Sequence, residues 1–232
     1  MEHEAFNFLK VIPGLKAFPE HVAGSLLVAA ILVIFSIFAR IALKRQGDAL
    51  VPPKRLSFFH FCDIVVEGIY KMSENTLGED TEFYLPIIGT LFLYIFLSNL
   101  LGLLPGFSPP TDNVNTNLAC GVFVYVYYNY RGFRAAGIGY LKHFLGPVWY
   151  MAWLLLPIEF ISHAVRPFTL ALRLKGNMTG DHTVLSVFTS LSPYVVPVPA
   201  YFLGLLTCFL QAFIFVMLTM VYIAMARDSD HH

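Results

Sequence analysis

Charged and polar residues recur through an apolar tract, residues 149–191, at a spacing that places them on one face of an α-helix. The members of this polar ribbon are Glu159, His163, Arg166, Arg173 and Asn177. On a helix of about 100° per residue their directions fall within about 80°, and Ser162 and Asp181 lie near the edges of the sector. Ionisable groups in the membrane persist when they face a bundle interior, a water-filled cavity or a counter-charge. The ribbon therefore favours ion binding or ion transport.

Arg173 lies near the middle of the ribbon and is the residue that most needs a partner. A charged side chain at the centre of a membrane helix costs about 2.5–3.5 kcal/mol or more. Glu159 is about 21 Å away along a helix, and Asp181 is about 12 Å away. The second and third apolar segments contain no acid in their cores. The partner of Arg173 is therefore expected to be an acid on another polypeptide or a transported anion.

Gln211 is the strongly polar residue of the last apolar tract. An interhelical hydrogen bond, worth ~1 kcal/mol, is an ordinary role for glutamine in a membrane. Gln211 is also suited to orient the Arg173 guanidinium without neutralising it.

The sequence gives no indication of a metal, a cofactor or a catalytic centre. The cysteines lack metal-ligand spacing, and His163 and His182 are too far apart for a paired metal motif. The stretches typical of serine hydrolases, zinc proteases and nucleotide-binding loops do not occur in the sequence. We therefore expect no enzyme activity from this chain by itself.

The composition is that of a membrane protein. Of 232 residues, 57% are hydrophobic and 13% are charged, whereas soluble domains carry roughly 25% charged residues. The formal net charge is zero, which gives a nucleic-acid partner no electrostatic basis.

The pattern of apolar segments predicts an all-α polytopic membrane protein that forms a single membrane domain over 1–232. Its predicted elements are an N-terminal span at 22–43, an interfacial amphipathic helix at 57–75, a two-span hairpin at 85–104 and 114–130, a long helical tract at 149–191 and a last helix at 200–226. Forty residues of helix measure about 60 Å, twice the hydrocarbon thickness. The long tract therefore either breaks into two spans or lies strongly tilted.

The amphipathic helix has an apolar face that is expected to lie in the inner interface of the membrane. That face consists of Phe58, Phe61, Ile64, Val65, Gly68 and Ile69.

Basic residues set the predicted orientation. The first span ends at Arg40, Lys44 and Arg45, and the loop after the third span carries Arg131 and Arg134. Both ends are expected to be cytoplasmic, whereas the loop GFSPPTDNVN holds no Lys or Arg and is expected outside. The N-terminus is then external and the C-terminus cytoplasmic.

Three stretches of the chain are similar to a known family. The run ALRLKGNMTGDH, preceded by PIEFISHAVRPFTL and followed by LQAFIFVMLTMVYIAMA, resembles subunit a of the F-type ATP synthase. The stretch SNLLGLLPGFSPPT is similar to the exit of that family's second span. The resemblance extends from about residue 60 to the C-terminus and is highly specific in the RLxGNM and QAFIF runs.

The resemblance implies a non-catalytic stator subunit of a rotary ATP synthase, in which proton flow through two offset half-channels drives rotation of the c-ring. The implied partners are c-ring subunits, peripheral-stalk b-type subunits and membrane lipid. The implied location is the inner (plasma) membrane of a bacterium. The resemblance also implies that the last two helices form a long, strongly tilted hairpin.

The resemblance assigns roles to particular residues. Arg173 corresponds to the arginine that faces the ring carboxylates, with Asn177 and Gln211 as its polar neighbours. Glu159, with Ser162 and His163, corresponds to the cytoplasmic half-channel. The external half-channel is assigned to His182 and Asp181, with Asp112 at its outer mouth.

Two positions depart from the family pattern. Lys175 stands where the family usually has an aromatic or apolar residue, and it is expected to face away from the ribbon. Gly204 stands where many relatives carry an ionisable residue, so proton entry is expected to depend on Asp181 and His182.

The alternative interpretation is a secondary transporter or channel in which Arg173 binds an anionic substrate. Such transporters usually show internal repeats and more spans, and the sequence shows neither.

Overall fold

The computed structural model describes residues 18–45, 58–104, 107–136, 152–191 and 197–228. All regular elements in these ranges are helices, so the all-α expectation is confirmed for this part of the chain. They are α1 (Glu20–Arg45), α2 (Phe58–Leu77), η2 (Gly78–Asp80), α3 (Thr81–Gly102), η3 (Pro110–Asp112), α4 (Val114–Ala136), α6 (Ala152–Leu191) and α7 (Pro197–Asp228).

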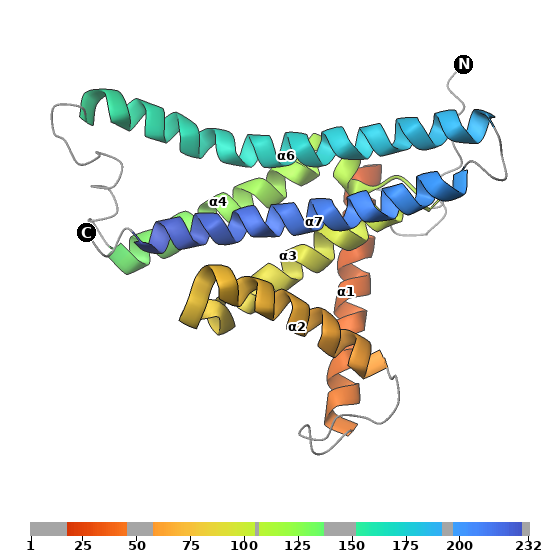
Figure 1. Cartoon of the computed structure of the whole chain (residues 1–232), viewed down its shortest axis with the longest axis horizontal. Helices are drawn as coiled ribbons and strands as arrows, with labels where there is room; N and C mark the ends of the chain where they lie inside the picture. The colour runs from red at the N-terminus through yellow and green to blue at the C-terminus, as the bar shows by residue number, and fades with distance from the viewer. Residues whose placement is uncertain (1–17, 46–57, 105–106, 137–151, 192–196, 229–232) are drawn as a thin grey trace.

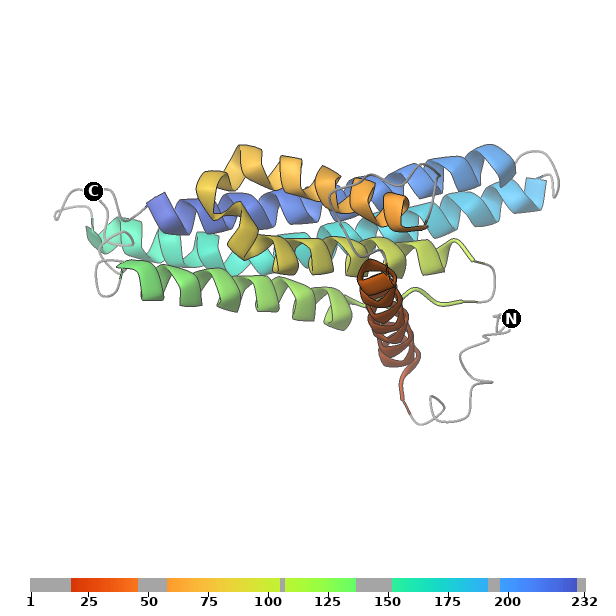
Figure 2. The same ribbon diagram turned by 90° about the horizontal axis from the view of Figure 1, so that it is seen from below.

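Helices α6 and α7 form an antiparallel hairpin along the longest axis of the molecule (Figure 1). Helix α6 is one uninterrupted α-helix of 40 residues that continues through Pro157 and Pro167. The long tract is therefore a single helix and does not break into two. Helix α1 runs across the direction of the hairpin, as Figures 1 and 2 both show.

The core lies where α3 and α4 pack against the hairpin. Its fully buried side chains come from all of these helices and include Ile88, Ile95, Val124, Tyr128, Leu170, Leu174, Ala212, Val216 and Met220. Burial of a large aliphatic side chain contributes about 1.5–3 kcal/mol in water, whereas in lipid close packing supplies most of the attraction between helices. This packing fixes the position of α6 along its axis relative to α3 and α4.

Helix α2 covers α3 and α7 through part of the predicted apolar face and its continuation along the helix. Ile69, Ser73 and Leu77 are buried, Val65 packs against the core, and the Ser73 hydroxyl donates to the Ile69 carbonyl at 2.8 Å. Ile64, at the edge of the predicted face, is exposed on the protein. The location of α2 in the inner interface of the membrane stays a prediction.

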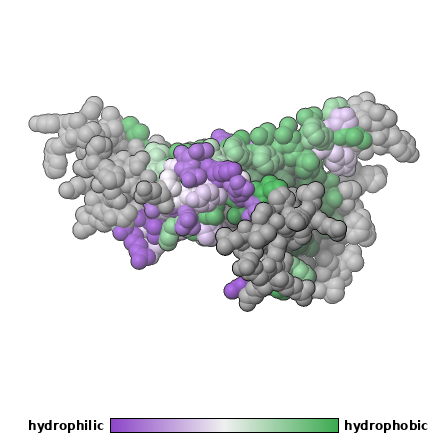
Figure 3. Space-filling model, turned by 60° about the horizontal axis from the view of Figure 1, so that its bottom comes forward, coloured by the Kyte–Doolittle hydropathy of each residue, from purple (hydrophilic) through white to green (hydrophobic). Residues whose placement is uncertain are grey.

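The opposite face of α2 is polar. The Lys71 ammonium and the Glu67 carboxylate form an exposed ion pair at 2.7 Å, which holds the pKa of Glu67 below its ordinary value. Figure 3 shows one face of the whole molecule. Hydrophilic residues gather on one side of the view, and hydrophobic residues cover most of the remaining described surface.

Three described helices are long and apolar enough to cross a membrane: Glu20–Ile41, Thr81–Gly102 and Val198–Met225. Helices α4 and α6 are not among them: α6 carries five charged residues, and in α4 asparagine and tyrosine side chains lower the mean hydropathy. Helix α3 begins at Thr81 rather than at residue 85, since the Thr81 hydroxyl donates to the Gly78 carbonyl at 2.6 Å and Tyr84 is buried.

Two glycines allow the end of α3 to approach the hairpin closely. A Cβ on Gly102 would overlap the Met178 methyl group of α6 and lie 2.9 Å from the Pro109 ring. A Cβ on Gly204 of α7 would lie 2.6 Å from the Leu103 side chain. The C-terminal end of α3 therefore packs closely against α6 and α7, and at Gly102 the Pro109 ring leaves little space for a larger residue.

We predict that Gly102→Ala lowers stability by about 1–3 kcal/mol, the usual cost of forcing extra atoms into a packed site. The matched control is Gly89→Ala on the same helix, where a Cβ meets no atom within 4 Å. Alanine is the better helix former by up to ~1 kcal/mol, so the control is expected to be neutral or stabilising. The midpoint temperature of thermal unfolding of the purified protein in detergent measures the stability of both variants. Equal midpoints for Gly102→Ala and Gly89→Ala would contradict the packing argument.

Candidate functional site

Arg173 lies on a face of α6 that points away from the core. The buried residues of α6 near it are Leu170, Ala171, Leu174 and Met178, and all face α3, α4 and α7. Arg173 itself is exposed, and Asn177, one turn further on, is partly exposed. Within the described part of the chain Arg173 makes no ion pair and no hydrogen bond. The guanidinium therefore faces outward without a counter-charge among the described side chains.

The exposed surface of the α6–α7 hairpin is strongly apolar. Leu172 is 60% exposed and Phe202 is 69% exposed. Other large exposed apolar side chains of the hairpin are Ile158, Ile161, Val165, Phe168, Val184, Val187, Leu203, Leu206, Phe209 and Leu210. An exposed apolar surface of this extent is typical of a membrane or protein interface. The site combines this apolar surface with a cation.

Gln211 of α7 is largely buried, with 8% exposed. It does not hydrogen-bond to Arg173 in this structure, because Arg173 makes no hydrogen bond in the described part of the chain. The structure thus places Arg173 and Asn177 one turn apart on α6 but shows no bond from either to Gln211.

The residues assigned to the cytoplasmic half-channel belong to the first half of α6. The backbone of Glu159, Ser162 and His163 is helical, and their side chains lie outside the described part of the structure. The same holds for His182 in the second half of α6. Along this continuous helix, Glu159 and His182 lie on opposite sides of Arg173, about 35 Å apart.

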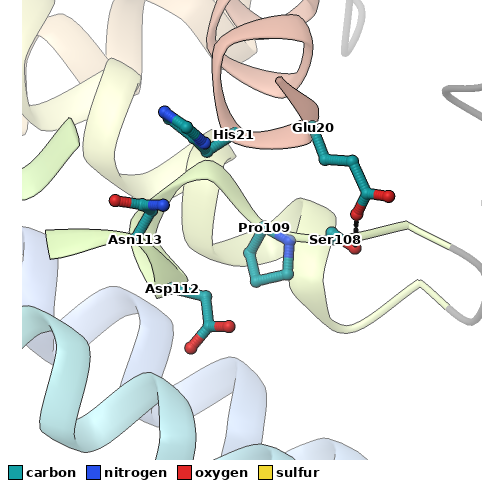
Figure 4. A pocket seen from close by; sticks show the side chains of 6 residues that line it. All are labelled: Glu20, His21, Ser108, Pro109, Asp112 and Asn113. Atoms are coloured by element: carbon teal, nitrogen blue, oxygen red, sulfur yellow. Dashed lines mark hydrogen bonds between the residues drawn. The ribbon is translucent and has the colours of Figure 1, made fainter. Parts of the chain in front are cut away.

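Asp112 belongs to η3, and its carboxylate faces α6 (Figure 4). The Thr179 hydroxyl of α6 donates to Asp112 Oδ1 at 3.3 Å. Asp181, two residues further along, is close enough to Cys208 of α7 for the two side chains to interact electrostatically. The structure therefore brings Asp112 and Thr179 together, and it places Asp181 on the side of α6 that faces α7.

A polar cavity of about 250 Å³ opens beside Asp112 (Figure 4). Its lining side chains come from the first turn of α1 and from the segment around η3: Glu20, His21, Ser108, Pro109, Asp112 and Asn113. The Ser108 hydroxyl donates to Glu20 Oε2 at 3.4 Å. Helix α1 can lie this close because Gly24 has no side chain facing Pro110, whose Cδ is 3.3 Å from the position of a Cβ.

Sequence analysis did not identify Glu20 and His21. They lie about ninety residues before Asp112, and only the packing of α1 against η3 brings them together. The available signal was weak: two ionisable residues at the outer end of an apolar helix.

Metal binding has no geometric basis among the described side chains. No group of three or more His, Cys, Asp or Glu side chains in that part of the chain is placed to hold a metal ion.

Comparison with known proteins identifies the family. The family model for the ATP synthase A chain matches residues 23–224. The ATP synthase subunit a of Bdellovibrio bacteriovorus is 40% identical over 98% of this chain and 100% of its own length. The corresponding protein of Geobacter sulfurreducens is 42% identical over 90% of this chain and 88% of its own length. ATP synthase subunit a 2 of Syntrophotalea carbinolica is 44% identical over 97% and 93% of the two chains. The resemblance noted in the sequence is thereby confirmed, and the chain belongs to the ATP synthase A chain family.

Proposed function

We propose that this chain is the ion-translocating stator subunit of a rotary ATP synthase and that Arg173 faces the carboxylates of the c-ring. Membership in the ATP synthase A chain family supports the stator role. The observation that carries the role of Arg173 is its exposure, without an ion pair in the described part of the chain, on a broad apolar surface of α6 and α7. A neutral rotor surface with one ionisable acid per subunit is complementary to such a surface.

The mechanism follows from the cost of charge in lipid. A protonated carboxylic acid is neutral and can pass through hydrocarbon, whereas a carboxylate requires water or a cation beside it. Arginine is charged at any physiological pH, so Arg173 stabilises the carboxylate and lowers its pKa. An arriving ring site therefore releases its proton near Arg173, and the fixed positive charge blocks direct proton leakage past that point.

Two offset half-channels give the proton flow its direction. The cytoplasmic half-channel is formed by Glu159, Ser162 and His163, and the external one by Asp112, Asp181 and His182. Glu159 lies before Arg173 on α6 and His182 lies after it, whereas Asp112 belongs to η3 and accepts a hydrogen bond from Thr179 of α6. The separation along α6, about 35 Å from Glu159 to His182, supports two distinct routes on either side of Arg173. A potential of 100 mV supplies about 2.3 kcal/mol per elementary charge that crosses, which biases the rotation.

The hairpin of α6 and α7 lies strongly tilted in the membrane. A helix of 40 residues exceeds the hydrocarbon thickness about twofold. Helix α1, one of the apolar spans, runs across the direction of the hairpin (Figure 1). If α1 crosses the membrane, α6 and α7 lie along it, and the long axis of the hairpin follows the rim of a ring.

The orientation follows from the basic residues and the polar loop. The N-terminus is external and the C-terminus is cytoplasmic, in the inner membrane of a bacterium. The partners are c-ring subunits, b-type subunits of the peripheral stalk and lipid. A transporter that binds an anion at Arg173 is disfavoured, because Arg173 lies exposed on an apolar surface rather than in an enclosed cavity.

We predict that Arg173→Ala abolishes proton-driven ATP synthesis while the subunits still co-purify. The loss follows because the substitution removes the fixed cation that stabilises the ring carboxylate. The matched control is Lys175→Ala, which removes a cation two residues away on a different side of α6 and is expected to keep most of the activity. The rate of proton-driven ATP synthesis in membrane vesicles is measured for both variants. A normal rate for Arg173→Ala would contradict the proposal.

We predict that Glu159→Gln slows passive proton flux by about 10- to 100-fold, since loss of a positioned proton-transfer group typically costs at least that much. Flux is measured at several pH values in vesicles stripped of the soluble ATPase sector. Glu82→Gln, which neutralises an exposed carboxylate in the first turn of α3, is the control. Equal flux in the two variants would remove Glu159 from the path.

A further inference from the structure

A largely apolar groove of about 540 Å³ lies between α1, α3 and α4. Its lining side chains come from the first three turns of α1, from the first three turns of α4 and from the middle of α3. The volume lies within the range of about 300–1,000 Å³ that is typical of ligand sites. None of its lining residues belongs to the site around Arg173, so the groove has no role in the function proposed above.

The groove exists because α1 packs closely on the other helices at one end only. Gly24 of α1 approaches Pro110, whose Cδ is 3.3 Å from the position that a Cβ would take. Beyond this contact, α1 and α4 run in different directions (Figures 1 and 2). Only 17% of the apolar span of α1 is buried, compared with 44% of the span in α3. The described side chains therefore leave a wedge of space between α1 and α4.

The polarity of the lining changes along the groove. His21 and Asn115 line it where α1 and α4 begin. Ala29 and Phe123 line it about two turns farther along the same helices, and Leu91 lines it from the middle of α3. Phe123 is 52% exposed, so the apolar part of the groove opens to the surroundings. This change from hydrogen-bonding groups to hydrocarbon matches the layout of a phospholipid molecule.

The groove adjoins the polar cavity described above, because His21 lines both. In Figure 4 the His21 side chain lies on the side of Asn113, and the Glu20 carboxylate lies on the side of Ser108. Asn113 Oδ1 accepts a hydrogen bond at 2.9 Å from the backbone N–H of Asn115, which lines the groove. The polar cavity and the apolar groove therefore meet at His21 and the start of α4.

The carboxylates of the polar cavity are complementary to a cationic group. Glu20 and Asp112 line it, and its lining residues in the described part of the chain include no Lys or Arg. An ionised carboxylate has about four acceptor sites, so the hydrogen bonds from Ser108 and Thr179 leave capacity for another donor. A primary ammonium supplies three N–H donors. A lipid without an amine would instead place its phosphate charge beside two carboxylates.

We propose that a phospholipid with a primary amine in its headgroup binds here, with one acyl chain in the groove and its ammonium in the polar cavity. His21, Asn115 and Thr116 line the groove at the junction, and each has a side-chain donor for the phosphate. The acyl chain then supplies the packing between α1 and α4 that side chains do not. The inference rests on the proposed membrane orientation, which places the lipid in the outer leaflet, and not on the role of Arg173.

A transmembrane helix of another protein fits this groove less well than an acyl chain does. A helix is about 10–12 Å wide with its side chains, so two turns of it occupy about 850 Å³ or more. The groove is smaller than that. A single acyl chain is far thinner, and its polar headgroup accounts for the carboxylates at one end, which an apolar helix leaves without a role.

The first test labels the groove with lipid. The purified complex is reconstituted into vesicles of phosphatidylethanolamine and phosphatidylglycerol in equal amounts, with a trace of either lipid carrying a photoreactive group in its acyl chain. After illumination, the labelled residues are identified by mass spectrometry. We expect the ethanolamine probe to label Leu91, Ala119 and Phe123 about 10-fold more than the glycerol probe, a preference that one charge-assisted hydrogen bond can supply.

Two results of this labelling would overturn the proposal. Equal labelling by both probes would show an ordinary lipid-facing surface without a headgroup site. Protection of the groove residues from both probes would show that protein, either a helix of another subunit or a second copy of this chain, covers the groove instead.

The second test fills the groove with a side chain. Ala29 lines the groove, whereas the adjacent Ala30 is exposed on α1 and does not line it. We expect Ala29→Phe to reduce labelling of Phe123 by the ethanolamine probe about 10-fold, which corresponds to about 1.4 kcal/mol of affinity. Ala30→Phe is the matched control and is expected to keep the labelling of the parent complex. Equal labelling in the two variants would contradict an acyl chain in the groove.

A third variant tests the headgroup contact without changing the groove. Glu20→Gln keeps the shape of the side chain and removes its charge, so the preference for the ethanolamine probe over the glycerol probe is expected to disappear. The control is Glu82→Gln, an exposed carboxylate in α3 that lines neither space. A preference that persists unchanged in Glu20→Gln would overturn the assignment of the amine to the polar cavity.

These outcomes are separate from the test of the proposed function. Unselective labelling overturns the lipid site even if Arg173→Ala abolishes ATP synthesis. Selective labelling that Ala29→Phe removes supports the lipid site even if the Arg173 variant remains coupled, in which case only the proposed role of Arg173 fails.

Discussion

The structure depends on one constraint: a guanidinium that cannot lose its charge must be held at an apolar surface. The core residues around it, Leu170, Leu174 and Met178, fix the rotation of α6 so that Arg173 points outward. If the chain supplied its own carboxylate at that depth, the charge would be neutralised permanently and the surface would carry no net field. The absence of an ion pair at Arg173 in the described part of the chain is therefore consistent with a site that a second protein completes.

The length of α6 has a physical consequence for the site. Because the helix is continuous through Pro157 and Pro167, one rigid element carries the residues on both sides of Arg173. Side chains from α3, α4 and α7 set the position of α6 along its axis. Asn117, whose amide reaches the Ala171 carbonyl, contributes to the same contact. Glu159, Arg173 and His182 therefore keep fixed positions along α6, and a shift of the helix along its axis would move all three together relative to α3 and α4.

The sequence predicted the helices well because their signals are local. The lengths of the apolar segments predicted the helices. Helical periodicity predicted the polar ribbon that includes Arg173 and Asn177. The packed face of α2 was predicted in part: Val65 and Ile69 of the predicted apolar face pack against the core, whereas Leu77 lies beyond the predicted set and is buried through tertiary contacts that the sequence pattern does not show. The cavity at Glu20 and His21 was missed because two residues ninety positions from Asp112 give no local signal. Gly204 was recognised from the sequence as a departure, but the contact of this position with the Leu103 side chain is a property of tertiary packing.

Buried polar side chains at the packed helix contacts have a structural use as well as a cost. Each buried polar atom without a protein partner costs about 1–3 kcal/mol unless water satisfies it, and among the described residues such atoms belong to Ser98, Asn99, Thr111 and Asn117. The fully apolar core around Ile88, Ile95 and Met220 shows that this fold readily fills its interior with aliphatic side chains. The Asn117 amide nitrogen nevertheless donates to the Thr111 carbonyl at 2.6 Å and to the Ala171 carbonyl at 3.5 Å. Asn117 therefore ties η3 and α4 to the turn of α6 that carries Arg173, which valine or leucine in its place cannot do.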